Sequence, residues 1–229
     1  MKKILLTILL CFWAIVAFAA FISMLTDNFD DNSIDLGKWT IVSNNTGEMN
    51  ETGEQLTFTT QTDGANDPEI SSKTTYDITG SQITVKIIDA GNQALTSLSF
   101  FPLGIWDSTY NSQVEWRIDG GIIDGVGDGS ATTATYVADT YRYLKIREAS
   151  GKIYLDYSAD GINWTNFSSV ANPFTMTSVW VNMRCRVTAE TSTTTAKVDD
   201  FNILPSGTTP SFSHAFNNGF GEGIDQGFN

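Results

Sequence analysis

Apolar and polar side chains alternate with a period of two along most of the chain, and this pattern predicts β-strands with almost no helix. Two of the clearest stretches are Gln82–Asp89 and Gln113–Asp119, where every second residue is apolar. Further strands are predicted over Trp39–Ser43, Gln55–Thr60, Ile70–Tyr76, Leu95–Phe101, Thr132–Val137, Tyr141–Arg147, Lys152–Tyr157, Val179–Thr188 and Thr194–Leu204. Short turns rich in Gly, Asn, Asp and Ser separate them. Many short strands at this spacing predict an all-β fold, an antiparallel sandwich of two sheets.

The same alternation assigns one face of each strand to the core and the other to solvent. The expected core faces carry Ile83, Val85 and Ile87; Val114, Trp116 and Ile118; and Leu144 and Ile146. The opposite faces mix aromatic rings with amide and charged groups, a combination that suits a sugar, which has polar edges and an apolar face. The residues expected to bind carbohydrate are Trp180, Tyr141, Tyr143, Glu115, Arg117 and Asn182. The alternative is an ordinary solvated sheet face with cross-strand pairs.

The N-terminus has the pattern expected of an export signal. Lys2 and Lys3 precede an uncharged apolar run from Ile4 to Leu25, and Ala17-Phe18-Ala19 is typical of a signal-peptide cleavage site. The run is also long enough for a retained anchor, because about 20 apolar residues span a bilayer. Residues 1–26 are therefore predicted to be a signal peptide or a membrane anchor, and the rest of the chain to be secreted or held at the cell surface. Any membrane contact is expected through this segment alone.

Charge and composition narrow the function further. The chain has 13 Lys and Arg against 26 Asp and Glu, for a net charge of −13, and such a surface repels nucleic acid. With one His and two Cys, a zinc cluster of those residues is excluded. Cys185 falls on an apolar strand face and is expected to be buried. The Asp/Gly-rich stretch from Asp119 to Gly129 is interpreted as a flexible hairpin.

Two motifs bracket residues 27–204. The sequence Asp27-Asn28-Phe29-Asp30-Asp31-Asn32, followed by Trp39, opens this region, and Val198-Asp199-Asp200-Phe201-Asn202-Ile203 closes it. This bracket resembles the concanavalin A-like lectin/glucanase superfamily, which includes laminin G-like domains. The resemblance implies a jelly roll in which the two motifs lie near each other.

The resemblance also implies a structural calcium ion. Members of the superfamily often bind calcium through an Asp of the last strand, a place that Asp199 or Asp200 matches. Asp30 or Asp31 would lie near it if the terminal strands pair, and such oxygen ligands suit a hard cation. The alternative is that these are solvated carboxylates at strand ends.

Enzymes of this superfamily use a strand motif E-x-D-x-x-E, which this sequence lacks. The nearest match places Glu115 and Asp119 on one face, about 14 Å apart at about 3.4 Å per residue. Retaining glycosidases need carboxyl groups about 5–5.5 Å apart. No catalytic residue is therefore predicted, and the chain is not expected to be an enzyme.

A change of composition after Leu204 sets off residues 205–229 as a tail rich in Gly, Asn and Phe. Its bulky residues recur at every fourth position, namely Phe212, Phe216, Phe220, Ile224 and Phe228. The tail is predicted either to add as an extended strand to a partner or to be disordered.

The leading hypothesis for function is a secreted or surface-tethered lectin-like module that binds an extracellular glycan without hydrolysing it. The alternative is a structural subunit of an extracellular filament, appendage or virion, joined to neighbouring copies or surface proteins through the tail.

Overall fold

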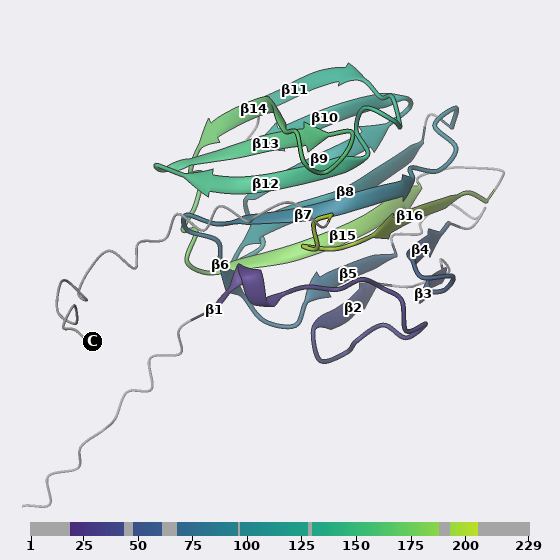
Figure 1. The fold of residues 1–229 in the computed structure, drawn as a ribbon, viewed down its shortest axis with the longest axis horizontal. Coiled ribbons are helices and arrows are strands. Elements are labelled where there is room, and N and C mark those ends of the chain that lie inside the picture. Colours follow the sequence, from purple (N-terminus) through teal and green to yellow (C-terminus); the bar gives the residue numbers. More distant parts are fainter. Residues whose placement is uncertain are drawn as a thin grey trace, which may run out of the picture.

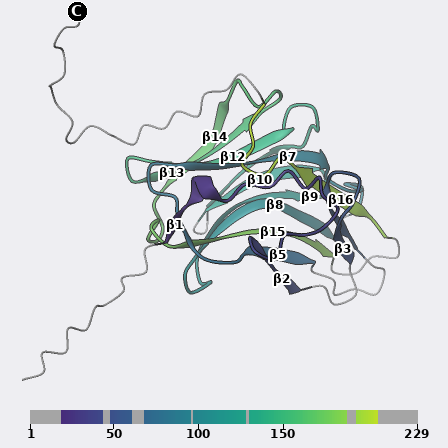
Figure 2. The same cartoon turned by 60° about the horizontal axis from the view of Figure 1, so that its bottom comes forward.

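The computed structural model describes residues 19–43, 48–60, 68–95, 97–127, 130–187 and 193–205. In these residues the chain forms two β-sheets packed face to face, with one short 3₁₀ turn, η1 (Ile22–Met24), as the helical element. Figure 2 shows the two layers from a second side, with β15 and β8 in one and β12 and β7 in the other. The predicted all-β sandwich is confirmed.

We call the two layers the front sheet and the back sheet. The front sheet has the order β1 (Ala20–Phe21), β6 (Tyr76–Asp77), β15 (Val179–Val187), β8 (Leu98–Asp107), β9 (Gln113–Asp119), β10 (Ile122–Gly127) and β11 (Ser130–Thr135); β5 (Glu69–Ser72) also pairs with β15, and β2 (Trp39–Ser43) with β5. The back sheet has the order β14 (Thr165–Ala171), β13 (Lys152–Ser158), β12 (Tyr143–Ala149), β7 (Gln82–Asp89), β16 (Thr195–Asp199), β4 (Leu56–Thr59) and β3 (Glu48–Glu51). Strand pairs in the described residues are antiparallel, apart from the short β1–β6 pair.

The core lies between the sheets and follows the predicted alternation. The predicted inward side chains of β7, β9 and β12 are buried, and Trp116 is fully enclosed between the layers. Its indole Nε1 donates a hydrogen bond to the carbonyl oxygen of Lys145 at 3.1 Å, which ties β9 to β12 across the sandwich. Cys185 is buried in the same core, as predicted.

The Asp/Gly-rich stretch that we interpreted as a flexible hairpin does form a hairpin, in which β9 turns at Gly120 and Gly121 into β10, a regular strand that the sequence analysis did not predict. The inward positions of β10 are Ile123, Gly125 and Gly127, so two of the three lack the apolar side chain that marks a strand in sequence. The glycines are needed for space. A Cβ at Gly125 would lie 2.7 Å from Cδ1 of Leu155 and 2.9 Å from Oγ of Ser168, both on the back sheet.

Gly125→Ala is expected to lower the free energy of unfolding by about 1–3 kcal/mol, because the new methyl group overpacks the contact between the sheets. Chemical denaturation measures this change. Adding Leu155→Val, which removes the nearest methyl group, should recover part of the loss in the Gly125→Ala background. A Gly125→Ala protein as stable as the wild type would contradict the tight contact between the two sheets at Gly125.

The folded unit begins before Asp27, so the boundary expected after residue 26 is wrong. Ala20 pairs with Tyr76, and Ile22 and Leu25 are buried in the core. Nδ2 of Asn202 donates hydrogen bonds to the carbonyl oxygens of Ile22 and Leu25, at 3.2 and 3.1 Å. The last part of the apolar N-terminal run is therefore a piece of the sandwich.

The two terminal predictions fall mainly outside the described residues. Residues 1–18, the greater part of the expected signal peptide or anchor, and residues 206–229 of the tail lie beyond them. In the residues that are described, no helix has the length and apolar character needed to cross a membrane.

Candidate functional site

The outward side of the front sheet, which we call the front face, gathers polar and aromatic side chains from β5, β8, β9 and β15. Because side chains alternate along a strand, β15 sends Val181 and Met183 into the core and Trp180, Asn182 and Arg184 outward. The outward residues of the other strands are Glu69 and Ser71 on β5; Phe101, Gly104 and Trp106 on β8; and Gln113, Glu115, Arg117 and Asp119 on β9.

Gly104 is the centre of the front face, because it pairs with Asn182 on one side and with Glu115 on the other. A Cβ at Gly104 would lie 2.5 Å from Oδ1 of Asn182 and 3.2 Å from Cβ of Glu115. The absent side chain therefore lets the carboxamide and the carboxyl side chain lean toward each other. Any larger residue at this position would push them apart.

Glu115 is 2% exposed and is held by two neighbours. Nε2 of Gln113 donates to its Oε1 at 2.8 Å, and Nη2 of Arg184 lies 3.2 and 3.4 Å from its two oxygens. Burial raises the pKa of Glu115 to about 7, although the nearby Arg184 and Arg117 act to lower it; the charge of Glu69 adds to the rise. Below neutral pH this carboxyl group carries a proton that it can donate.

In the described part of the front face, four buried polar atoms have no hydrogen-bond partner. They are Nε of Arg184, Nε1 of Trp106, Oδ1 of Asn182 and Oδ1 of Asp124, which lies on β10 opposite Arg117. Asn182 is only 1% exposed, and its Nδ2 donates to Oε1 of Glu69 at 3.3 Å. An unsatisfied buried polar group costs about 1–3 kcal/mol. These two donors and two acceptors are therefore suited to the hydroxyl groups of a ligand.

A row of aromatic rings borders this polar centre. Tyr110 stacks on Trp180 with ring centroids 5.5 Å apart and planes 16° apart, and it lies 6.1 Å from Trp106. The guanidinium of Arg184 lies over Trp106 and Phe101, 5.2 and 4.1 Å from their ring centres. The row offers flat apolar surface beside the unpaired donors, which matches the two sides of a sugar ring.

Tyr110 belongs to the tight β8–β9 hairpin and has a positive φ of 59°. The carboxylate of Asp107 holds this turn by accepting hydrogen bonds from the backbone N–H groups of Asn111 and Ser112. Sequence reasoning missed Tyr110 because it considered strand faces and not turn tips. It missed Trp106 and Gly104 because a glycine and Pro102 obscure the alternation of β8.

The structure brings together four of the six residues predicted to bind carbohydrate, and it separates two. Trp180, Glu115, Arg117 and Asn182 share the front face, where Arg117 forms an ion pair with Asp124. Tyr143 lies on β12 of the back sheet, and Tyr141 precedes that strand and is buried.

The six residues predicted to bind carbohydrate therefore do not lie on one face. The ring centroid of Tyr141 lies 4.6 Å from that of Tyr157, which is on β13 of the back sheet. Alternation tells which residues point outward, but it does not tell to which of the two sheets a strand belongs.

The predicted calcium ligands Asp199 and Asp200 are engaged by an ammonium group instead. Nζ of Lys86 lies 2.9 Å from Oδ2 of Asp199 and 3.0 Å from Oδ2 of Asp200. Burial alone would lower the pKa of Lys86, but the hydrogen bonds to both carboxylates raise it. A fixed positive charge thus takes the place in which a cation would have to bind.

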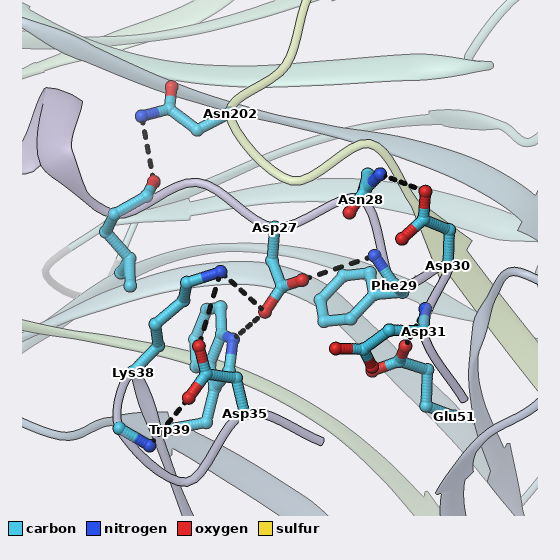
Figure 3. Close-up of polar contacts among 12 residues, drawn as sticks. Asp27, Asn28, Phe29, Asp30, Asp31, Asp35, Lys38, Trp39, Glu51 and Asn202 are labelled. Atoms are coloured by element: carbon cyan, nitrogen blue, oxygen red, sulfur yellow. Dashed lines mark hydrogen bonds and ion pairs between the residues drawn. The ribbon is translucent and has the colours of Figure 1, made fainter. Parts of the chain in front are cut away.

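The other two predicted ligands, Asp30 and Asp31, lie in the opening segment (Figure 3). Asp30 accepts a hydrogen bond from Asn28, and Asp31 accepts one from the backbone N–H of Ser33. In the part of the chain that the structure describes, no three His, Cys, Asp or Glu residues converge as metal ligands would. The four predicted residues therefore do not fit a calcium ion.

The opening and closing motifs do meet, as the resemblance implied, through Asp27, Trp39 and Phe201. The backbone N–H of Asp27 donates to the carbonyl oxygen of Phe201 at 3.0 Å, in an isolated antiparallel bridge. Oδ2 of Asp27 accepts a hydrogen bond of 2.7 Å from Nε1 of Trp39 (Figure 3). Phe29 and Phe201 pack on the same indole. The bracket is a structural joint between the chain ends.

Comparison with known proteins identifies the architecture. No family model and no curated protein matches the sequence. Among solved structures, the β-glucanase of Bacillus licheniformis superposes with a TM-score of 0.58 at 13% identity, covering 77% of this chain and 95% of the enzyme. The laminarinase from Flavobacterium sp. UMI-01 gives 0.59 at 6% identity, covering 77% and 96%. The likeness shows the fold, a jelly-roll sandwich.

These neighbours overturn the prediction of a lectin-like module without hydrolase activity, and with it the alternative of a structural subunit. Besides the glucanase and the laminarinase, the similar structures include porphyranase B from Zobellia galactanivorans, with a TM-score of 0.51 at 11% identity, covering 81% of this chain and 93% of that enzyme. The jelly rolls that this chain resembles are glycan-cleaving enzymes, so the expectation of a non-enzyme is corrected. At such low identities the likeness itself concerns the fold.

Proposed function

We propose that the chain is a glycoside hydrolase that cleaves polysaccharides at the front face, with Glu115 as the proton donor. The observation that carries this proposal is a carboxyl group with a pKa of about 7, buried at the centre of a face with unpaired donors and aromatic rings. The glucanases and laminarinases of the same fold support the reaction class.

Glycoside hydrolysis needs an acid that still holds its proton at the working pH and gives it to the leaving oxygen. An ordinary Glu is ionised at neutral pH, and burial is a common way to keep one protonated. Glu115 meets this requirement.

Substrate must displace the guanidinium of Arg184 to reach Glu115, because the carboxyl group is covered in the free protein. The contacts between them are 3.2 and 3.4 Å, longer than those of an ideal charge-assisted pair. Sugar hydroxyl groups then supply partners for Nε1 of Trp106 and Oδ1 of Asn182. The exposed ring of Tyr110 stacks beneath a neighbouring sugar.

An exported site of action belongs to the same proposal. Polysaccharides are extracellular polymers, and the basic, apolar N-terminus predicts either secretion or a cell-surface location. The partner is then an extracellular glycan.

The test is hydrolysis of laminarin, mixed-linkage β-1,3-1,4-glucan and porphyran by the full chain, followed by the release of reducing ends. We expect cleavage of at least one polymer, with kcat/KM constant at mildly acidic pH and falling tenfold per pH unit above about 7, because Glu115 loses its proton there. Glu54→Gln, at an exposed turn, should leave this profile unchanged. Absence of cleavage on every polymer, or a rate that stays level from pH 6 to 9, contradicts the proposal.

A further inference from the structure

We propose that the chain carries a signal-peptidase cleavage site between Ala19 and Ala20, so that the mature protein begins with strand β1 and is released from the membrane. The inference deepens the exported location in the proposed function, because it chooses secretion over a cell-surface anchor. It does not depend on hydrolysis, so the two proposals can fail separately.

Among the described residues, regular structure begins at Ala20. This residue pairs with Tyr76 in the β1–β6 ladder and packs, partly buried, against the core. Ile22 is fully buried and Leu25 is 1% exposed, and the carbonyl oxygens of both accept hydrogen bonds from Nδ2 of Asn202. At these buried positions the apolar side chains are required by the sandwich, and they are not evidence for a membrane segment.

Without the residues that belong to the fold, the apolar run has the length of a signal peptide. From Ile4 to Leu25 the run has 22 residues, more than the roughly 7–15 of a signal-peptide apolar region. The part before the cleavage motif, Ile4–Val16, has 13 residues and lies within that range. Ala17-Phe18-Ala19 then supplies the small residues that signal peptidase recognises. The excess length that favoured a retained anchor therefore belongs to the sandwich.

The same start of the fold leaves too few residues for a membrane anchor. A hydrocarbon core about 30 Å thick needs about 20 helical residues. Between Lys3 and Ala20 the chain has 16 residues, and a helix of that length reaches about 24 Å at about 1.5 Å per residue. A span of about 20 residues would include Ala20–Ser23, which takes β1 away from β6 and Ile22 out of the core. Anchoring therefore sacrifices part of the fold.

Cleavage after Ala19 leaves the core whole, whereas cleavage further along the chain does not. A cut after residue 26 would remove Ile22 and Leu25 from the core and leave the carboxamide of Asn202 without either acceptor. The reaction is hydrolysis of one peptide bond by the signal peptidase of the cell. Water adds across the bond, so that Ala19 ends in a carboxylate and Ala20 begins with an amine.

The experiment is expression of the full chain in a Gram-negative bacterial host, followed by cell fractionation, intact mass measurement and N-terminal sequencing. We expect the sequence Ala-Phe-Ile-Ser-Met, which starts at Ala20, in the soluble periplasmic fraction. Ala19→Leu places a large side chain beside the scissile bond and should abolish processing, which leaves a full-length chain in the membrane fraction. Phe18→Leu, at the middle position of the motif, is the matched control and should be cleaved like the wild type.

A wild type that keeps residues 1–19, in whichever fraction, overturns the inference; in the membrane fraction it would place the exposed Phe21 and Met24 near the bilayer surface. A mature N-terminus at another residue, or an Ala19→Leu chain processed like the wild type, overturns it as well. Hydrolysis of the three polymers is assayed separately on the purified product. An uncleaved chain that is active overturns this inference alone, and a correctly cleaved chain that attacks none of them overturns the hydrolase proposal alone.

Discussion

Glu115→Gln is expected to lower kcat on the cleaved polysaccharide by about 10²–10⁴-fold, because an amide has no proton to give to the leaving oxygen. The substitution keeps the shape of the side chain and one oxygen that accepts from Gln113, and it loses one of the two contacts with Arg184, which substrate displaces in any case, so KM should change little. Single-turnover and steady-state kinetics at pH 6 measure the effect. A kcat within a factor of five of the wild type contradicts the role of Glu115.

The same variant is expected to be more stable than the wild type near neutral pH. This effect tests the burial of Glu115 independently of catalysis. The pKa of Glu115 is raised from 4.5 to about 7, so the native state holds a proton that the unfolded chain has lost between these values. The wild type therefore loses stability as pH rises from about 4.5 to about 7, by an amount on the order of 3 kcal/mol. Gln does not titrate. The gain in melting temperature of Glu115→Gln over the wild type should grow from pH 5 to pH 8.

Trp39→Ala is expected to lower the free energy of unfolding by about 3–5 kcal/mol, the usual cost of emptying a large buried aromatic site. The indole of Trp39 is fully buried at the joint between the chain ends, with its ring 5.0 Å from that of Phe201 and edge-on to it. The loss also leaves the buried carboxylate of Asp27 without the indole donor. Denaturation in guanidinium chloride measures the change.

Two further variants separate packing from hydrogen bonding at this joint. Trp39→Phe keeps most of the ring volume and removes the donor to Asp27, so its loss should be smaller than that of Trp39→Ala. Leu36→Ala, on the exposed preceding turn, should be close to neutral. A Trp39→Ala protein as stable as Leu36→Ala would show that the opening and closing motifs contribute nothing to the fold.

The sequence predicted the fold best where one strand face is uniformly apolar. Strands β7 and β9 have the predicted bounds, because Ile83, Val85 and Ile87 alternate strictly with polar residues. The prediction ended too early in β8, which runs to Asp107 through a proline and a glycine. In β10 it failed because close approach of the two sheets requires glycine at inward positions. Alternation reveals strands whose inward side chains fill the core. It misses strands whose inward positions are glycines.

The candidate site was predicted only in part, again because alternation is informative on long strands and not on short ones. Glu115 and Asn182 were found because they alternate with core residues on long strands. Glu69 was missed because it begins the short strand β5 after Pro68, where periodicity has no length to develop. Tyr143 was wrongly added, because a single strand carries no information on the layer to which it belongs. The place of Glu69 on the front face and the sheet to which Tyr143 belongs are both decided by pairing between strands that are distant in sequence.

The hydrogen bonds from Asn202 to Ile22 and Leu25 have a kinetic consequence. They join the first and the last folded segments across about 180 residues, so this part of the core closes only after nearly the whole chain has been synthesised. Loop closure over such a sequence separation is slow, and folds rich in long-range pairings need milliseconds to seconds. During that interval Ile22 and Leu25 have no place to be buried, so both side chains stay exposed until the closing segment docks.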